Sequence, residues 1–531
     1  MSRTCMFRTK SLQFESLESR RLLALTSLGD ELRVNDRVQG LQTAPADADA
    51  VAAFTAGGFV AAYSGVSFTD RAGVSVRRFD SEGAEIGSRI QVNTSIQGLQ
   101  HEAAVATLDD GTFVVAWSGR GHGDKRGVFA QWFDSDGEKI GTEVLVNQTT
   151  GGVQSAPQLA SLGNSVAIVW QGVGARSGEE DVDGVFLRTF DDQGNPTTDE
   201  QRVNSTTEDQ QVDPSLAANS DGTLLVAWSS RHQDGSDWGV FAQRFAMDAT
   251  SEGGELPVNT TTLGSQQKPS ITALTNGEFQ VAYQSRNAEV TNETILSQGF
   301  TSAGATSGVE VQLDDGAESL RRDVALAAIP SGGFVAGWAS GVPNDDGWEV
   351  KLRDFDADGT ALADEVFSHP TLFGPNSGTQ ASPSLAANAG GQLLAAWVGQ
   401  GTTDRRGVFA QRFMTDGEID NGEQQPPDLA EIPNQTIAAG ETLMLTLTAT
   451  DPNPLDLLFI QVDEDVSPPN VMINQTDFTA TGTTATLTWE SSESDAGSTF
   501  TFRILVTDDG VPTLADVEEF TVTIGEASDE G

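Results

Sequence analysis

The chain has very few of the residues that build cross-linked or metal-centred sites. It contains one cysteine, Cys5, and therefore has no internal disulfide framework. It contains four histidines, none in a close metal-binding spacing such as His-Glu-x-x-His: His101, His122, His232 and His369. We therefore expect the stability of the fold to come from the packing of the chain itself.

Positive charge and long hydrophobic runs are also scarce. The 30 Lys and Arg residues stand against 77 Asp and Glu, which gives a net charge of −47. Such a field repels phosphate backbones, so we expect no nucleic-acid partner. It favours solubility, and attraction of divalent cations is a second interpretation, but we favour solvation of a large surface as the explanation. No apolar run approaches the roughly 18 residues that cross a bilayer, so the sequence predicts no transmembrane segment and a soluble chain.

What the sequence does contain is a long repeat. An apolar run that ends in an aromatic residue recurs seven times, at intervals of 53 to 59 residues. A period of this size predicts one supersecondary unit that is stacked repeatedly. The aromatic positions are Tyr63, Trp117, Trp170, Trp228, Tyr283, Trp338 and Trp397.

Each copy predicts four short strands. In the second copy they cover 102–108, 112–117, 127–133 and 144–147, and they are separated by Asp-Gly turns and one polar loop at 118–126. The run T-F-V-V-A-W in the second strand fits burial on both faces. Four strands per unit at this period predict the blade of a β-propeller.

The two ends of the repeat predict how the ring closes. The last copy stops after its third strand, near 414–417, and the missing Val-Asn strand stands at 31–35, ahead of the first copy. Pairing the two leaves no open sheet edge. The predicted fold is all-β: a seven-bladed β-propeller of four-stranded blades, closed by an N-terminal strand and followed by a small β-sandwich. An open solenoid is the alternative.

The N-terminus differs from the rest of the chain. Residues 1–24 carry five basic residues and an apolar stretch that is too short and broken for a secretory signal. The run F-E-S-L-E-S-R-R-L-L-A at 14–24 resembles the LEPR-type motif of large surface proteins in planctomycete bacteria, with Ser19 where that family often has Pro or Asp. The resemblance implies an export segment at 1–28 and an extracellular or cell-surface location in a bacterium. An amphipathic leader helix without a targeting role is the alternative.

The wording of the repeat carries a second resemblance. The phrases V-N-[TQS]-[ST], D-G-x-[FL]-V-V-A-W and G-V-F-A-Q-R-F-D-x-D-G resemble a repeat of large bacterial secreted calcium-associated proteins, which often also carry RTX-type or cadherin-like modules. The resemblance covers residues 31–417 and implies secretion and binding. The chain lacks the glycine-aspartate nonapeptides of the RTX module, so the resemblance does not extend to calcium sites of that type.

A different pattern follows the predicted propeller at 29–417. Residues 418–427 form a polar linker that ends in two prolines, 428–525 hold several short alternating strands, and 526–531 form an acidic tail. Such strands predict an antiparallel sandwich. The segments NQTIAAGETLMLTLTATDPN and FTFRILVTDDGVPTLADVEEFTVTI resemble the Ig-like and cadherin-like modules of bacterial surface proteins.

Calcium is the one cofactor for which the chain offers candidate ligands. In cadherin-like modules acidic loops hold this ion, which prefers six to eight oxygen ligands. Carried onto this chain, the resemblance implies a metal site at Asp451, Asn453, Asp508 and Asp509. Simple turn chemistry for Asp-Pro and Asp-Asp-Gly is the alternative, and we favour it.

Two further motifs point to turns. The D-x-D-G sequences at 134–137 and 356–359 lack the remaining ligands of an EF-hand, and equivalent copies vary, so we predict hairpin turns. Asn-x-Ser/Thr ends the fourth strand in several copies, where we expect side-chain capping of a shared turn in place of glycosylation. These asparagines are Asn93, Asn147, Asn204 and Asn259.

One face of the predicted ring is the candidate binding surface. The loops between strands two and three and those between blades share that face, and they are long, variable and charged, whereas the turns on the other face are tight. We expect Trp238 and Trp348 to stack on sugar rings. The alternative is a solvated face without a ligand. The candidate ligand-binding residues are Arg120, His122, Asp124, Arg126, Arg231, His232, Asp237, Trp238, Asp346, Trp348, Asp404 and Arg405.

No strong catalytic motif stands out, so the sequence predicts a secreted, non-catalytic and monomeric binding or adhesion protein. Its propeller face would recognise an extracellular glycan or protein partner, and the C-terminal module would act as a spacer. Two alternatives stay open. One is a calcium-dependent structural module. The other is a propeller glycoside hydrolase or lyase acting on extracellular polysaccharide, which would show inward carboxylates converging near the axis on the long-loop face.

Overall fold

The computed structural model is built from β-strands. Within the ranges that it describes there is no α-helix, only one short 3-10 helix, η1 (Glu493–Asp495), so the all-β prediction is confirmed. The chain divides into two compact units, Met1–Ile419 and Asp420–Gly531. The described residues are 25–35, 42–43, 50–55, 57–65, 72–173, 183–286, 293–316, 320–341, 347–367, 380–399, 407–415, 426–451, 458–463, 466–475, 483–508 and 514–525.

The first unit consists of antiparallel sheets that follow one another along the chain, and a single parallel pairing, of Trp238 with Ser265, joins the fourth and the fifth into one eight-stranded sheet. Their strands, sheet by sheet, are β2 (Gln42–Thr43), β3 (Val51–Ala53), β4 (Phe59–Gly65), β5 (Gly73–Phe79) and β6 (Glu85–Gln91); β7 (Gln100–Thr107), β8 (Phe113–Gly119), β9 (Gly127–Phe133) and β10 (Lys139–Leu145); β11 (Gln154–Ser161), β12 (Ser165–Gly172), β13 (Gly184–Asp191) and β14 (Gln201–Arg202); β15 (Gln211–Ala218), β16 (Leu224–Arg231), β17 (Trp238–Phe245) and β18 (Ser251–Pro257); β19 (Ser265–Ala273), β20 (Phe279–Arg286), β21 (Glu293–Phe300) and β22 (Thr306–Gln312); β23 (Leu320–Ala328), β24 (Phe334–Gly341), β25 (Trp348–Phe355) and β26 (Val366–Phe367); and β27 (Ala381–Ala387), β28 (Gln392–Gly399) and β29 (Gly407–Met414) with β1 (Thr26–Arg33).

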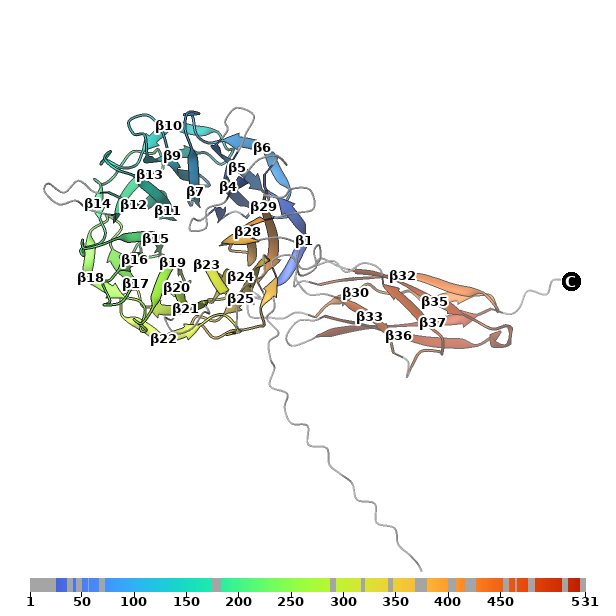
Figure 1. Ribbon diagram of the computed structural model, residues 1–531. Helices are drawn as coiled ribbons and strands as arrows, with labels where there is room; N and C mark the ends of the chain where they lie inside the picture. Colours follow the sequence, from blue (N-terminus) through green and yellow to red (C-terminus); the bar gives the residue numbers. More distant parts are fainter. Residues whose placement is uncertain are drawn as a thin grey trace, which may run out of the picture. The chain divides into compact units, whose positions relative to one another are not determined.

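The innermost strands of these sheets form a closed ring, as in a propeller (Figure 1). The strands β3, β7, β11, β15, β19, β23 and β27 each contact the next one in this order, and β27 contacts β3. The open solenoid, which was the alternative, would leave β3 and β27 apart.

The ring closes through the two ends of the repeat. β1 pairs antiparallel with β29, with Thr26 opposite Met414 and Arg33 opposite Phe409. The pairing continues past the strand, because Val34 N–H donates to the carbonyl of Val408 at 2.9 Å. The predicted pairing of the N-terminal segment with the last sheet is confirmed, although the strand begins earlier than the sequence indicated. The outer edge of β29 is therefore covered.

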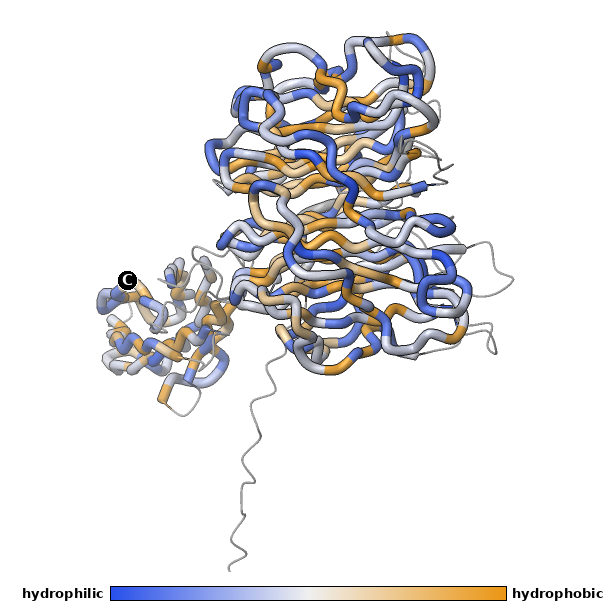
Figure 2. The backbone as a smooth tube through the Cα atoms, turned by 90° about the vertical axis from the view of Figure 1, so that its left-hand side faces the viewer, coloured by the Kyte–Doolittle hydropathy of each residue, from blue (hydrophilic) through white to orange (hydrophobic). Residues whose placement is uncertain are grey.

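The strands are held by a dry interior. Every residue of β8 and β9 is buried, as expected for strands covered by sheets on both sides. The tryptophans that end the second strands are almost fully buried: Trp117, Trp170, Trp228, Trp338 and Trp397. Figure 2 shows hydrophobic segments crossing the body of the unit and hydrophilic segments at its rims.

The Val-Asn motif is explained by one repeated hydrogen bond. Asn147 Oδ1 accepts from the backbone N–H of Val128 at the start of the third strand, at 2.8 Å, and its Nδ2 donates to the carbonyl of Thr149. The prediction of side-chain capping is confirmed. The same bond to a third-strand N–H is made by Asn35, Asn93, Asn204 and Asn259, and by Asp314 in the copy that has aspartate at this position.

The D-x-D-G sequences form hairpin turns, as predicted. Asp134 Oδ1 accepts from the backbone N–H of Asp136 at 3.0 Å and of Glu138 at 2.8 Å. Asp356 makes the same two contacts with Asp358 and Thr360. These aspartates cap their own turns.

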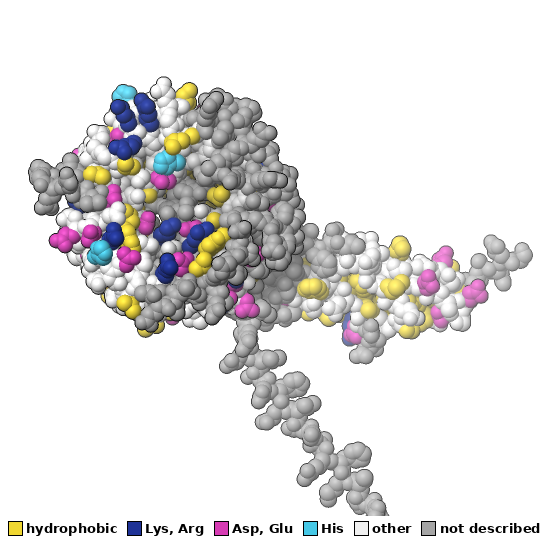
Figure 3. Space-filling model, viewed as in Figure 1, with side chains coloured by type: hydrophobic (Ala, Val, Ile, Leu, Met, Phe, Trp, Pro, Cys, Tyr) yellow, Lys and Arg dark blue, Asp and Glu magenta, His cyan; other side chains and the backbone are white. Residues whose placement is uncertain are grey.

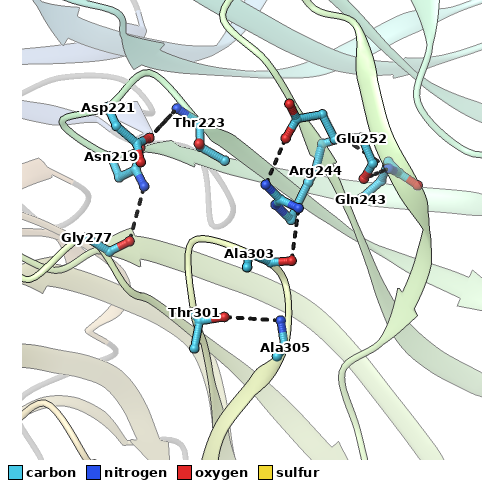
Figure 4. Close-up of polar contacts among 10 residues, drawn as sticks. All are labelled: Asn219, Asp221, Thr223, Gln243, Arg244, Glu252, Gly277, Thr301, Ala303 and Ala305. Atoms are coloured by element: carbon cyan, nitrogen blue, oxygen red, sulfur yellow. Dashed lines mark hydrogen bonds and ion pairs between the residues drawn. The ribbon is translucent and has the colours of Figure 1, made fainter.

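Neighbouring sheets are also tied together near these short turns (Figure 4). Asn219 donates to the carbonyl of Gly277 in the next sheet at 3.1 Å. Arg244 donates to the carbonyl of Ala303, also in the next sheet, and forms an ion pair with Glu252 on its own sheet. The short-turn side is therefore occupied by structural contacts.

The second unit has two four-stranded sheets around one apolar core that contains Trp489, Phe502 and Phe520. Along β35 buried and half-buried residues alternate, the pattern of a strand with one face on a core. One sheet comprises β30 (Asp428–Leu429), β32 (Thr442–Thr450), β35 (Thr483–Glu490) and β34 (Met472–Gln475), and the other β31 (Gln435–Ile437), β37 (Ala515–Ile524), β36 (Thr499–Thr507) and β33 (Phe459–Val462).

Candidate functional site

A backbone distortion recurs at one position of the innermost strands. A non-glycine residue there has a left-handed φ of 51° to 55°, and the strand register shifts beside it. Bulges of this kind re-aim side chains, and such strain is common at functional sites. We call these residues the bulge ring: Glu102, Ala156, Asp213, Lys268, Asp323 and Ser382.

The bulge ring lies toward the long-loop face. In the fourth sheet the shift occurs between Val212 and Ser215, and Val212 pairs with Ser229 near the end of β16 that leads into the loop to β17. The tight turn at Asp221 stands at the other end of β16. Because each bulge lies on an innermost strand, its side chain belongs to the axial mouth of the ring on the face with the long loops.

Hydrogen bonds between neighbouring sheets fix the bulges. Ser229 Oγ accepts from the backbone N–H of Lys268 at 2.9 Å and contacts Asp213 Oδ2 at 3.1 Å. The backbone N–H of Asp213 donates to Gln171 Oε1 of the preceding sheet at 2.8 Å. The distorted backbone is therefore held from both sides, which makes the position of each side chain well defined.

Charged residues of opposite sign gather at this mouth. Lys268 Nζ lies 2.9 Å from Asp323 Oδ1, and Arg322 Nε lies 3.8 Å from Asp323 Oδ2. Glu293, at the start of β21, pairs with Arg286 on β20. The charges of Arg322, Asp323 and Lys268 act on the pKa of its carboxyl group. In Figure 3, basic and acidic side chains lie close together near the centre of the ring. We call Asp213, Lys268, Glu293, Arg322 and Asp323 the axial cluster.

Two carboxyl groups of the axial cluster hold their protons more tightly than usual. Burial raises the pKa of Asp213, and the nearby charge of Lys268 opposes the rise only in part. Burial likewise raises the pKa of Glu293 against the charge of Arg286. Asp323 is nearly fully buried and forms an ion pair with Lys268.

A second charged pair stands on the same bulge ring. Burial raises the pKa of Glu102, but hydrogen bonds outweigh this and lower it to about 2. They come from His101, from Ser118 Oγ at 2.6 Å and from the backbone N–H of Ala156 at 2.9 Å. The hydrogen bond with Glu102 raises the pKa of His101. The pair therefore combines an ionised carboxylate with an exposed histidine.

The ligand-binding residues predicted on the second copy lie in one loop after β8. Arg120, His122 and Arg126 are exposed. Asp124 is buried, accepts from the backbone N–H of Arg126 and binds Asn147 Nδ2 at 2.9 Å. Asp124 therefore supports the loop, while the other three side chains face solvent.

The residues predicted on the fourth copy form a separate group. Arg231 lies 3.9 Å from Asp237 and 5.9 Å from the centre of the Trp238 ring. His232 contacts Asp209 at 3.0 Å. The residues predicted on the second and the fourth copy thus lie on different loops, and their joint binding of one ligand stays a prediction. Asp346, Asp404 and Arg405 lie outside the described residues.

Trp348 contacts Arg322 of the axial cluster. The Arg322 guanidinium lies 3.6 Å from the centre of its ring, and the ring packs so closely on Gly341 that a Cβ there would come within 2.8 Å. Arg322 therefore covers one face of the Trp348 ring, and stacking of Trp348 on a sugar ring stays a prediction.

The predicted calcium ligands are only partly described, since Asn453 and Asp509 lie outside the described residues. Asp508 Oδ1 accepts from the backbone N–H of Leu514 at 2.8 Å, as a turn residue does. In the described part of the chain no three His, Cys, Asp or Glu side chains are arranged to hold a metal. Calcium at Asp451 and Asp508 stays a prediction.

Sequence reasoning missed the bulge ring and the axial cluster. One signal was present: each bulge residue stands 14 or 15 residues before the aromatic residue that ends the second strand. Charged residues such as Glu102, Asp213 and Lys268 recur at this position of the innermost strands. A charged residue that recurs at one register of innermost strands indicates a lined axial opening.

Comparison with known proteins yields structural matches only. No known family model matches the sequence, and no curated protein matches it. Among solved structures, the polysaccharide lyase Uly1 is similar over 73% of this chain and 100% of its own, with 12% identity and a TM-score of 0.48. The α-L-arabinofuranosidase Arb93A of Fusarium graminearum matches over 58% of this chain and 91% of its own, with 14% identity and a TM-score of 0.39. The arabinanase Arb43A of Bacillus subtilis covers 51% of this chain and 98% of its own, with 14% identity and a TM-score of 0.30.

The comparison corrects the predicted function. The chain was predicted to be a non-catalytic binding or adhesion protein and not an enzyme, whereas the three matched structures are enzymes that act on polysaccharides or arabinosides. At these identities the likeness concerns the propeller-like fold. Any reaction of this chain must be argued from its own residues.

Across the described ranges, no helix has both the length and the apolar character that crossing a bilayer requires.

Proposed function

We propose that this chain is an enzyme that cleaves the glycosidic bonds of an extracellular polysaccharide, with its reaction centre at the axial cluster. The observation that carries the proposal is the convergence of Asp213, Glu293 and Asp323 with Lys268 at the mouth of the ring. Inward carboxylates near the axis on the long-loop face are the feature that separates an enzyme of this architecture from a passive scaffold.

The axial cluster supplies two kinds of carboxyl group. Asp213 and Glu293, whose pKa values burial raises, can retain a proton and donate it to the oxygen of the bond that breaks. Asp323, ion-paired with Lys268, supplies a fixed negative charge. A buried acid that retains its proton, close to a second carboxyl group, is an arrangement found in sites that cleave glycosidic bonds.

The proposal includes the finer architecture and its setting. We take the ring as a seven-bladed propeller and the second unit as an Ig-like or cadherin-like β-sandwich that acts as a spacer. The resemblances of the N-terminal motif and of the repeat support an exported bacterial protein. A polysaccharide outside the cell is the substrate that such a location makes available.

The proposal is tested by incubating the purified full chain with a panel of uronate, sulfated and neutral polysaccharides and measuring new reducing ends. We expect at least one polymer to be cleaved, and Asp213→Asn to lower the rate by about 100-fold or more, because proton transfer typically contributes 10²- to 10⁴-fold. Asp358→Asn, in an exposed short turn, is the matched control and should leave the rate unchanged. Equal rates for both variants would refute the assignment.

A further inference from the structure

The charge at the axial cluster differs from that of the whole chain. The chain has 77 acidic and 30 basic residues. In the axial cluster with the adjoining Arg286, the basic Lys268, Arg286 and Arg322 equal in number the acidic Asp213, Glu293 and Asp323, whereas the ionised Glu102 stands on a different sheet of the bulge ring. Because burial favours the protonated forms of Asp213 and Glu293, the local field is less negative than this count alone suggests. The mouth is therefore a place where an anion is tolerated on an otherwise acidic protein.

Arg322 is the basic residue best placed to meet a ligand. Its guanidinium lies on the Trp348 ring at 3.6 Å, which fixes its plane. Among the described residues no hydrogen-bond partner is found for its buried Nε, and Asp323 stands beyond hydrogen-bond distance at 3.8 Å. An arginine stacked on an aromatic ring keeps its N–H groups in a plane parallel to the ring, and that planar fork matches a carboxylate or a sulfate.

Lys268 stands on the other side of Asp323 and completes the basic edge of the mouth. Its Nζ is 2.9 Å from Asp323 Oδ1, and its side chain retains 29% exposure. Asp323 therefore lies between two cations, Lys268 and Arg322. This arrangement keeps both cations close to the carboxyl groups assigned to cleavage.

We propose that Arg322, positioned by Trp348 and assisted by Lys268, binds an anionic group of the sugar at the cleaved bond, so that the substrate is an anionic polysaccharide. This inference rests on the proposed function and names its substrate class. The recognised group is a carboxylate of a uronic acid or a sulfate ester, which share the geometry that a guanidinium binds.

The test measures binding of the full chain to polygalacturonate, carrageenan and arabinan by affinity electrophoresis, at low and at high salt. We expect binding to one of the two anionic polymers, weaker at high salt, and none to neutral arabinan. Preference for polygalacturonate identifies a carboxylate and preference for carrageenan a sulfate. Arg322→Gln should weaken this binding by at least about tenfold, since hydrogen bonds to charged groups contribute about 1.5–3 kcal/mol.

Arg231→Gln is the variant for the competing site, because Arg231 is one of the ligand-binding residues predicted from the sequence and lies near Trp238 at 5.9 Å, outside the axial cluster. It should bind like the wild type. Arg322→Lys keeps the charge without the planar fork and should bind with intermediate strength. A melting temperature equal to that of the wild type shows that a variant is folded. If Arg322→Gln is not folded, the inference is tested by comparing the binding of Arg322→Lys with that of Arg231→Gln.

The inference and the proposed function fail in different ways. Cleavage of arabinan alone, with unchanged binding in Arg322→Gln, would overturn the anionic substrate and leave the enzyme in place. Binding of an anionic polymer that depends on Arg322, without cleavage of any polymer, would support the anion site and refute the enzyme. Equal loss of binding in Arg231→Gln and Arg322→Gln would place recognition on the outer loops and overturn the inference.

Discussion

Asn35 Oδ1 accepts a hydrogen bond from the backbone N–H of Val408 at 2.8 Å, although 373 residues separate the two in the chain. The same bond joins Asn147 to Val128 inside a single sheet, across 19 residues. The seam of the ring therefore uses an ordinary contact of the repeat, made between the two ends of the unit.

Asn35→Ala should destabilise the ring by about 1–3 kcal/mol, because it leaves the buried N–H of Val408 without its acceptor. Urea unfolding measures the loss. Asn259→Ala removes the equivalent bond to Val240 within one sheet and serves as the control. Limited proteolysis should release the N-terminal segment faster in Asn35→Ala than in Asn259→Ala. Unchanged unfolding and proteolysis in Asn35→Ala would show that the seam does not depend on this bond.

The seam should also weaken as pH rises. Glu31 on β1 is half-buried, and burial raises its pKa from 4.5 to about 7. A group whose pKa is higher in the folded state stabilises that state below its unfolded pKa, and this contribution is lost as pH rises through the folded pKa. The melting temperature of the wild type should therefore fall relative to Glu31→Gln between pH 5 and pH 8. Parallel pH curves for the two proteins would contradict the burial of Glu31.

Glu102 should have the opposite pH dependence. Its pKa is lowered to about 2 in the folded chain, so its contribution is present above its unfolded pKa of 4.5 and is lost as pH falls toward 2. The melting temperature of Glu102→Gln should therefore fall less with decreasing pH than that of the wild type. The pKa of His101, followed by NMR, should also fall in this variant, because its hydrogen bond with the carboxylate is lost. An unchanged His101 pKa would refute the pairing.

Ala156→Gly should stabilise the ring by up to about 1 kcal/mol. Ala156 has a φ of 51°, a left-handed conformation that glycine adopts without steric cost. The backbone N–H that binds Glu102 is retained in the variant. Thermal unfolding measures the change, and Ala160→Gly in the regular part of β11 is a control that should destabilise. A lower melting temperature for Ala156→Gly than for the control would argue against strain at the bulge.

Gly172→Ala should destabilise the unit, because its Cβ would come within 1.7 Å of Gln154 Oε1. That oxygen accepts from Trp170 Nε1, so moving Gln154 disturbs a buried network. We expect a loss of about 1–3 kcal/mol in urea unfolding, as for other overpacked sites. Gly254→Ala, where a Cβ meets nothing within 4 Å, should be close to neutral. Equal stability of the two variants would contradict the contact.

Much of the fold was predictable because its determinants are local. Asp-Gly turns, buried aromatic strands and the Val-Asn cap each act within one copy, and the missing fourth strand indicated how the ends pair. The axial cluster was not predictable in this way. Asp213, Lys268 and Asp323 stand on three different copies, and only the ring brings them together. Their left-handed backbone also opposes local preference, since a residue before proline, as at Asp213 and Lys268, favours extended conformations.

The location of the reaction centre at the axial cluster is tested most directly by a crystal structure of Asp213→Asn soaked with an oligosaccharide of whichever polymer the chain cleaves or binds. We expect the sugar to bind in the axial mouth, with a glycosidic oxygen within hydrogen-bond distance of the side chain at position 213 or of Glu293. A sugar bound only on the outer loops near Arg120 or Arg231, with the axial mouth empty at saturating ligand, would contradict it.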